Sequence, residues 1–155
     1  MATLTPTLTL VSTDLHSDSL NLTVTDSLTV SAPASGIARL ATSANPLGAG
    51  AGVLITEASA TTTTFVYVKH LGVLASDGTT SCHATNDFVV LTNEDADTTF
   101  IKLQPGEFCF FPLLEFDGGD GGNVDEPGGL KVEGGGVGRG GAAHVMIEYG
   151  YWTRG

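Results

Sequence analysis

Leucine and threonine alternate at the start of the chain. Between residues 3 and 11, leucines occupy positions 4, 8 and 10 and threonines occupy positions 3, 5, 7 and 9, with Pro6 interrupting the pattern. A period of two residues predicts a β-strand with one buried face, and Pro6 confines such a strand to a sheet edge or to the start of an arm. Segments 17–24 and 25–30 follow, and in each an aspartate suited to a turn precedes a short alternating run.

Residues 1–31 differ in composition from the rest of the chain, because they contain no Lys, Arg, Gly, Phe, Tyr or Trp. Strands of Thr and Leu alone cannot bury a core, so this segment must add to a sheet edge, either in its own domain or in a neighbouring molecule. We therefore predict an extended N-terminal arm, or edge strands, over residues 1–31. An ordinary first hairpin of the same domain obeys the same hydrogen-bonding rule and stays open as an alternative.

The remaining residues, 32–155, are predicted to form a single β domain. After a loop of small residues, runs of β-branched and aromatic residues bounded by Gly, Asn, Asp and Pro occupy residues 52–57, 64–70, 87–92, 98–103 and 107–113, and a last apolar run occupies 143–152. No long segment repeats apolar residues with the helical period. This spacing favours an all-β fold, and we predict an antiparallel β-sandwich with a glycine-rich loop region over 118–141, where half of the residues are glycine.

Residues 88–113 hold the densest strand pattern. We predict three adjacent antiparallel strands there, the last two joined by a type II turn at the Gln-Pro-Gly-Glu of residues 104–107, because Pro suits the second position of that turn and Gly the third. In the last strand Phe108 and Phe110 point to one side, and Phe111 points to the other. Since this strand is apolar on both sides, we expect it at the centre of a sheet or covered by another subunit.

The chain is strongly acidic, with a formal charge of −11 from 17 acidic and 6 basic residues. Such a chain repels phosphate groups, so we expect neither nucleic acid nor an anionic membrane as a partner, and a cationic or mixed-charge protein surface fits better. The first residues lack the pattern of a signal peptide and no segment is long and apolar enough to span a membrane, which predicts assembly in a cytoplasm. In that reducing compartment, Cys82 and Cys109 are expected as free thiols.

Candidate catalytic and metal-binding groups are sparse. The acidic segment 117–126 offers oxygen ligands that Ca²⁺ accepts, but it lacks the spacing of a known calcium loop, and we favour a solvated acidic surface loop. Cys82 and His83, with His70, lack the second pair of soft ligands that a zinc site needs. No orienting carboxylate or oxyanion loop is recognisable, so we predict no enzyme, no metal and no cofactor. A polysaccharide hydrolase would need carboxylates of segment 117–126 in a fixed geometry, which its glycines oppose.

Three parts of the sequence give the chain a resemblance to a known class of protein. They are the Thr/Ser/Leu arm over 12–30, the Phe-Val-Tyr-Val-Lys-His of 65–70 followed by the Phe-Ile-Lys-Leu-Gln-Pro-Gly-Glu-Phe of 100–108, and the closing Val-Met-Ile-Glu-Tyr of 145–149. With them the chain resembles virion structural proteins of tailed bacteriophages, in particular the small all-β head-decoration (cement) proteins. The resemblance implies a homotrimer on the capsid exterior that clamps subunits of the major capsid protein and is anchored by its N-terminal arm.

These observations lead to one functional hypothesis and one alternative. We expect a structural virion protein, a jelly-roll-like β-sandwich, that decorates and stabilises a bacteriophage capsid assembled in the host cytoplasm. The residues expected to bind the capsid are leucines of the arm, namely Leu4, Leu8, Leu10, Leu20 and Leu22. The residues expected at an oligomer interface are aromatic residues of the later strands, namely Phe108, Phe110, Phe111, Tyr149 and Tyr151. The alternative is a tail, fibre or adaptor component with a receptor-binding or connecting role.

Overall fold

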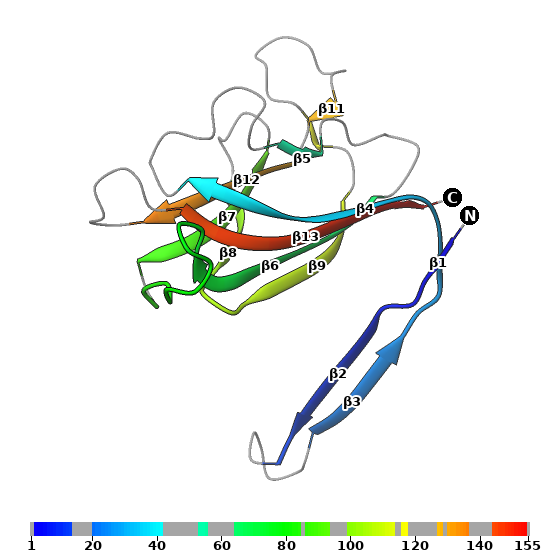
Figure 1. Ribbon diagram of the computed structural model, residues 1–155. Coiled ribbons are helices and arrows are strands. Elements are labelled where there is room, and N and C mark those ends of the chain that lie inside the picture. The colour runs from blue at the N-terminus through cyan, green and yellow to red at the C-terminus, as the bar shows by residue number, and fades with distance from the viewer. Residues whose placement is uncertain are drawn as a thin grey trace.

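The computed structural model describes residues 2–13, 20–41, 53–55, 64–84, 86–93, 99–113, 116–117, 127–128, 130–136 and 144–154. Every regular element in these ranges is a β-strand, and all strand pairs are antiparallel (Figure 1). Helices able to cross a membrane do not occur in this part of the chain. The prediction of an all-strand, antiparallel fold is confirmed.

Two larger sheets form the body of the molecule. The five-stranded sheet has the order β1 (Ala2–Leu4), β4 (Leu28–Ala41), β13 (His144–Arg154), β6 (Thr64–Leu74) and β9 (Phe108–Leu113). The four-stranded sheet has the order β5 (Val53–Ile55), β12 (Leu130–Gly136), β7 (Asp87–Asn93) and β8 (Thr99–Leu103). Two shorter ladders pair β2 (Thr7–Ser12) with β3 (Leu20–Thr25), and β10 (Phe116–Asp117) with β11 (Pro127–Gly128).

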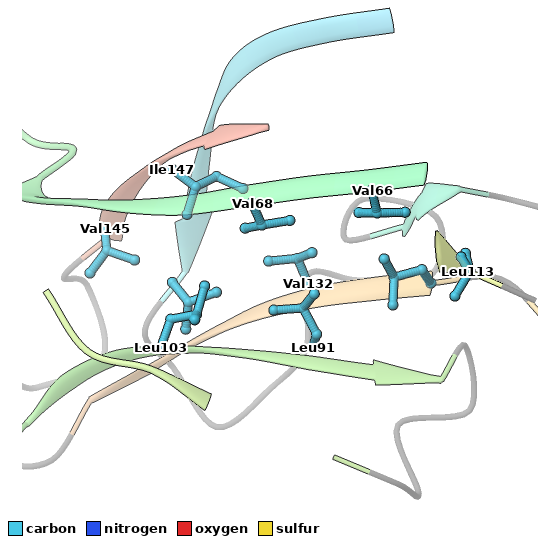
Figure 2. Packing of buried hydrophobic residues seen from close by; sticks show 10 residues of the cluster. Val66, Val68, Leu91, Leu103, Leu113, Val132, Val145 and Ile147 are labelled. Atoms are coloured by element: carbon cyan, nitrogen blue, oxygen red, sulfur yellow. The ribbon is translucent and has the colours of Figure 1, made fainter. Parts of the chain in front are cut away.

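The hydrophobic core combines side chains from both larger sheets. Because successive side chains of a strand point to opposite faces, β6 buries Val66 and Val68 and leaves Phe65 and Tyr67 partly exposed on the other side. Figure 2 shows Val66 and Val68 facing residues of the four-stranded sheet. The buried cluster consists of Val66, Val68, Leu113, Val145 and Ile147 from the five-stranded sheet and Val89, Leu91, Leu103, Leu130 and Val132 from the four-stranded sheet.

The predicted meander over residues 88–113 is only partly correct. Strands β7 and β8 pair as expected, but β9 leaves their sheet and pairs with β6 in the five-stranded sheet. The turn between β8 and β9 has the predicted form, since the Glu107 N–H donates to the Gln104 carbonyl at 2.9 Å and Gly106 has a φ of 90°.

Main-chain hydrogen bonds to His70 explain the new partner of β9. His70 N–H donates to the Glu107 carbonyl at 2.9 Å, and Gly106 N–H donates to the His70 carbonyl at 3.0 Å. These bonds continue the β6–β9 ladder into the turn, so the turn carries the chain from one sheet to the other. Strand β9 is consequently the last strand of the five-stranded sheet, and the expectation that it lies at a sheet centre is wrong.

The N-terminal segment divides into two parts. Strand β1 pairs with the start of β4, so residues 2–4 belong to the five-stranded sheet. Strands β2 and β3 pair with each other over all six of their residues and project away from the body as a hairpin (Figure 1). The Asp26 N–H donates to the Pro6 carbonyl at 3.1 Å, which links this hairpin, residues 7–12 with 20–25, to the β1–β4 ladder.

Candidate functional site

The face of the five-stranded sheet that points away from the core is rich in aromatic side chains. It carries Phe65 and Tyr67 from β6, Phe108 and Phe110 from β9, and Trp152 from β13, and we call these five residues the aromatic face. Each alternates along its strand with residues that pack in or against the core. Strand register places Phe65 between Trp152 and Pro112, and Tyr67 beside Phe110. The aromatic face therefore spans three neighbouring strands.

The rings of the aromatic face contact one another in pairs. The Phe65 and Phe110 rings are stacked, with centroids 6.0 Å apart and planes inclined by 8°. The Tyr67 and Phe108 rings are tilted by 47° with centroids 6.4 Å apart. Both separations lie in the favourable range for aromatic pairs. Even so, Phe108 remains 60% exposed and Phe110 39% exposed, so the ring pairs do not cover the surface that they form.

Trp152 lies across a glycine of its own strand. A Cβ atom built on Gly150 would come within 2.6 Å of Trp152 Cη2 and 3.0 Å of Cζ2. The absence of a side chain at Gly150 thus lets the indole ring lie flat along β13. Trp152 is the one tryptophan of the chain, which makes it an intrinsic optical probe of this surface.

A small polar group adjoins the aromatic face. The Tyr67 hydroxyl donates to Glu148 Oε1 at 3.1 Å, and Lys69 is the cross-strand neighbour of Glu148. Burial, followed by the hydrogen bond and the charge of Glu148, raises the pKa of the Tyr67 phenol above its ordinary value. The phenol therefore stays neutral at physiological pH, and Glu148 and Lys69 beside it have opposite formal charges.

The two sides of the projecting hairpin differ in composition: one is apolar, and the other is mostly threonine but includes Val11, which is 67% exposed. Register places Leu8 beside Val24 and Leu10 beside Leu22 on one side, whereas threonines predominate on the other. The Thr7 and Thr25 hydroxyls are 3.2 Å apart on that second side. The four residues of the first side, which we call the hairpin apolar side, are exposed to 48% (Leu8), 43% (Leu10), 42% (Leu22) and 52% (Val24).

The hairpin and the aromatic face meet at a cleft of about 330 Å³. Its lining comes from the base of the hairpin and from β6 and β9, namely Pro6, Thr7, Leu8, Tyr67, Phe108, Cys109 and Phe110. Burial raises the pKa of the Cys109 thiol in this lining to about 11, so the thiol stays protonated and unreactive at neutral pH. The hairpin apolar side and the aromatic face are thereby joined at one concave corner.

The residues expected to bind a capsid occupy two environments. Leu8, Leu10 and Leu22 are exposed on the hairpin. Leu20 is partly buried at the far end of the same ladder, opposite Ser12. Leu4 is partly buried in β1, beside Leu28 of the five-stranded sheet.

The aromatic residues expected at an oligomer interface also separate. Phe108 and Phe110 belong to the aromatic face, whereas Phe111, Tyr149 and Tyr151 are partly buried and pack against the core. Phe65, Tyr67 and Trp152 were not among the expected interface residues. The alternation in residues 64–70 already places Phe65 and Tyr67 on one side of a strand, and that signal was sufficient to find two of them.

The remaining candidates for chemistry do not gather into a site. Among the residues that the structure describes, no three His, Cys, Asp or Glu side chains are placed to hold a metal ion. Neither Cys82 nor Cys109 forms a disulfide. Residues 118–126 of the acidic segment considered for Ca²⁺ lie outside the described residues, and Asp117 pairs with Pro127 in a two-stranded ladder.

His70 has a structural position at the end of the core. It is fully buried, and its Nδ1 accepts a hydrogen bond from Gly72 N–H at 3.0 Å. Burial lowers the pKa of the imidazole below its ordinary value of 6.5, although the nearby Asp87 acts in the opposite direction. The hydrogen bond requires Nδ1 to be unprotonated, so His70 is neutral with its proton on Nε2.

Comparison of the chain with protein-family models, with curated proteins and with solved structures gives no match.

Proposed function

We propose that this protein is a structural virion protein that decorates and stabilises the outside of a bacteriophage capsid. The proposal includes the finer fold, a β-sandwich of jelly-roll type, and a homotrimeric state. The core supports the sandwich, because buried residues of two antiparallel sheets pack in one cluster. The resemblance of the sequence to head-decoration proteins supplies the virion context.

The projecting hairpin is the observation that carries this proposal. A two-stranded hairpin alone is at best marginally stable in water and needs a third strand or a packed face. Here the hairpin apolar side leaves each of its four large residues at least 42% exposed. Exposed apolar surface that continues into an aromatic face marks a protein interaction site. We therefore assign the hairpin and the adjoining face to binding neighbouring protein subunits.

The physical work of such a protein is to add contact area across joints between subunits. Apolar side chains of the hairpin supply area, and the outer edges of β2 and β3 offer main-chain groups to a strand of the partner. A stable interface needs roughly 1,200 Å² or more in total, which a hairpin of two six-residue strands alone does not supply. The aromatic face adds to it. The major capsid protein is the proposed partner, and the formal charge of −11 favours a mixed-charge or cationic surface on it.

Two variants with matched charges test the proposal. Leu10→Glu with Leu22→Lys places an ion pair on the hairpin apolar side, whereas Thr9→Glu with Thr23→Lys places the same pair on the adjacent rung of the opposite side. Neither variant changes the net charge, and each puts opposite charges on directly paired residues. Only the first interrupts the apolar contact.

The assay uses particles from a phage in which the gene for this protein has been inactivated. Wild-type protein and the threonine-side variant are expected to co-sediment with these particles, and electron microscopy is expected to locate them on the head. The leucine-side variant is expected to stay in the supernatant. Density on the tail instead would favour the tail or fibre alternative, and failure of the wild type to bind would refute the proposed function.

A further inference from the structure

We propose that the aromatic face is the docking site for the hairpin of a second copy of this chain. The inference names the molecule that covers the apolar surfaces of the site described above, so that the outer main-chain edges of β2 and β3 are left for the capsid, and it rests on the proposed function in taking the protein to self-associate. Its two halves are the hairpin apolar side of one copy and Phe65, Tyr67, Phe108, Phe110 and Trp152 of the other. In a single chain the hairpin apolar side, Phe108 and Phe110 are exposed, and Phe65, Tyr67 and Trp152 are partly exposed.

The hairpin cannot cover the aromatic face of its own chain. Its base is fixed by the β1–β4 ladder, which ends at Leu4 and Leu28, and by the hydrogen bond from Asp26 N–H to the Pro6 carbonyl. From that base β2 and β3 run away from the body (Figure 1), so contact with the aromatic face is limited to the cleft at Leu8. Leu10 and Leu22, farther along the hairpin, are left for another molecule.

Charge favours a second copy as that molecule. The chain carries −11 overall, so two copies repel each other over most of their surfaces. The two hairpin strands contain no ionisable side chain. Beside the aromatic face, Lys69 and Glu148 are neighbours of opposite sign. These two surfaces are therefore places where two acidic copies can approach with little electrostatic cost.

The size of the contact sets the strength of the exchange. Each six-residue strand spans roughly 20 Å and the pair is roughly 10 Å wide, so the hairpin covers roughly 200 Å² of a neighbour. Mutual exchange in a two-fold dimer places two such contacts in one interface and, counted on both partners, buries roughly 800 Å², whereas cyclic exchange in the trimer of the proposed function buries roughly 400 Å² in each interface. Both areas lie below the roughly 1,200 Å² of a stable interface, so the hairpin contact by itself predicts a weak, concentration-dependent oligomer.

Light scattering coupled to size-exclusion chromatography tests the inference through the mass of the isolated protein. Wild type and the Thr9→Glu/Thr23→Lys control are expected at two or three times the chain mass of 15.9 kDa. The Leu10→Glu/Leu22→Lys variant and a Phe108→Thr/Phe110→Thr variant are expected at the mass of one chain. A wild type that is monomeric over the micromolar range, or either variant remaining oligomeric, would overturn the inference.

Two further measurements sharpen the result. Apolar contact holds the two copies together, and the repulsion between two acidic chains opposes it. Salt screens that repulsion, so raising NaCl from 50 to 500 mM should strengthen association. Weaker association at high salt would contradict docking between neutral surfaces. Dilution of the wild type should shift Trp152 emission to longer wavelength as the aromatic face becomes exposed. Circular dichroism confirms that each variant is folded, and the milder Leu10→Ser/Leu22→Ser replaces a variant that is not.

The outcomes separate this inference from the proposed function. A monomeric wild type that still coats phage heads would refute the hairpin exchange and leave the decoration function in place. An oligomeric wild type that loses its oligomeric state in both variants, but binds no head, would support the exchange and refute the decoration function.

Discussion

Acidification should destabilise the protein through one buried histidine. His70 is fully buried, and its Nδ1 accepts the Gly72 N–H at 3.0 Å. Protonation would place a proton on Nδ1, remove the acceptor of that bond and put a charge at the end of the core. Burial accordingly lowers the pKa of His70 in the folded protein below 6.5, its ordinary value.

The direction and slope of the effect follow from this lowered pKa. Between the pKa of the unfolded chain, about 6.5, and the lower pKa of the folded protein, the unfolded state binds more protons at residue 70. The free energy of unfolding therefore falls as the pH falls, by up to about 1.4 kcal/mol per pH unit for one proton. The contribution of His70 is fully present above about pH 6.5 and is lost progressively below it.

Urea unfolding of the wild type and of His70→Gln from pH 8 to pH 5 measures this effect. Glutamine is neutral throughout and its carbonyl can accept from Gly72 N–H. The difference between the two proteins isolates residue 70, because the other titrating groups contribute to both. We expect this difference to be constant from pH 8 to 7 and to shift against the wild type below about pH 6.5. A constant difference over the whole range, or an NMR titration midpoint for His70 at or above 6.5, would refute the argument.

Three other substitutions test particular parts of the structure. Gly106→Ala forces a side chain into a turn position with a φ of 90° and should lower the free energy of unfolding by about 1–2 kcal/mol; an unchanged urea midpoint would count against the turn. Gly150→Ala places a Cβ 2.6 Å from Trp152 Cη2, so the indole must move and its fluorescence maximum should change, whereas an identical spectrum would contradict the observed packing. Leu91→Ala removes a fully buried core side chain and should cost about 2–5 kcal/mol in chemical unfolding, and a loss below about 1 kcal/mol would be inconsistent with its position.

Local sequence patterns were sufficient to predict the strands and one turn. Alternation identified the run at residues 64–70, which lies within β6, and the Pro-Gly pair identified the turn at residues 104–107. The same patterns could not identify the partner of β9. A turn of this type connects two strands whether or not they pair, and the hydrogen bonds that decide the outcome come from His70, far earlier in the chain. Pairing over such a separation leaves no local signal.

The candidate site was predictable only in parts. The alternation in the arm predicts that Leu8 and Leu10 share one side of a strand, but not that this side is exposed in a single chain. For β9, however, both sides of the strand are apolar, so alternation separates the sides without showing which one faces the core. The sequence therefore groups Phe111 with Phe108, although Phe111 packs against the core and Phe108 is exposed. In β13 the side opposite Tyr149 includes His144 and Glu148, so alternation alone indicates that Tyr149 lies on the core side. The cleft between the base of the hairpin and β9 was not predictable from local patterns. Its formation depends on the direction in which the hairpin leaves the five-stranded sheet, and that direction is set by the whole fold.

Because β9 is the last strand of its sheet, its aromatic residues lie beside main-chain groups that no further strand of that sheet pairs with. In a central strand those groups would be paired. Proteins usually protect a sheet edge with charged side chains, a proline, a bulge or a covering segment. The six residues of β9 contain no charge, and Pro112 alone supplies a protecting feature. Phe108 and Phe110 lie beside that edge and are exposed. In the part of the chain that the structure describes, this edge has few protecting features and lies beside exposed rings, which is a hazard for disordered aggregation, and a single defined neighbour at this place removes the hazard. A hairpin from a second copy meets that requirement, because its uncharged strands bring apolar side chains to the rings and add no charge to an acidic protein.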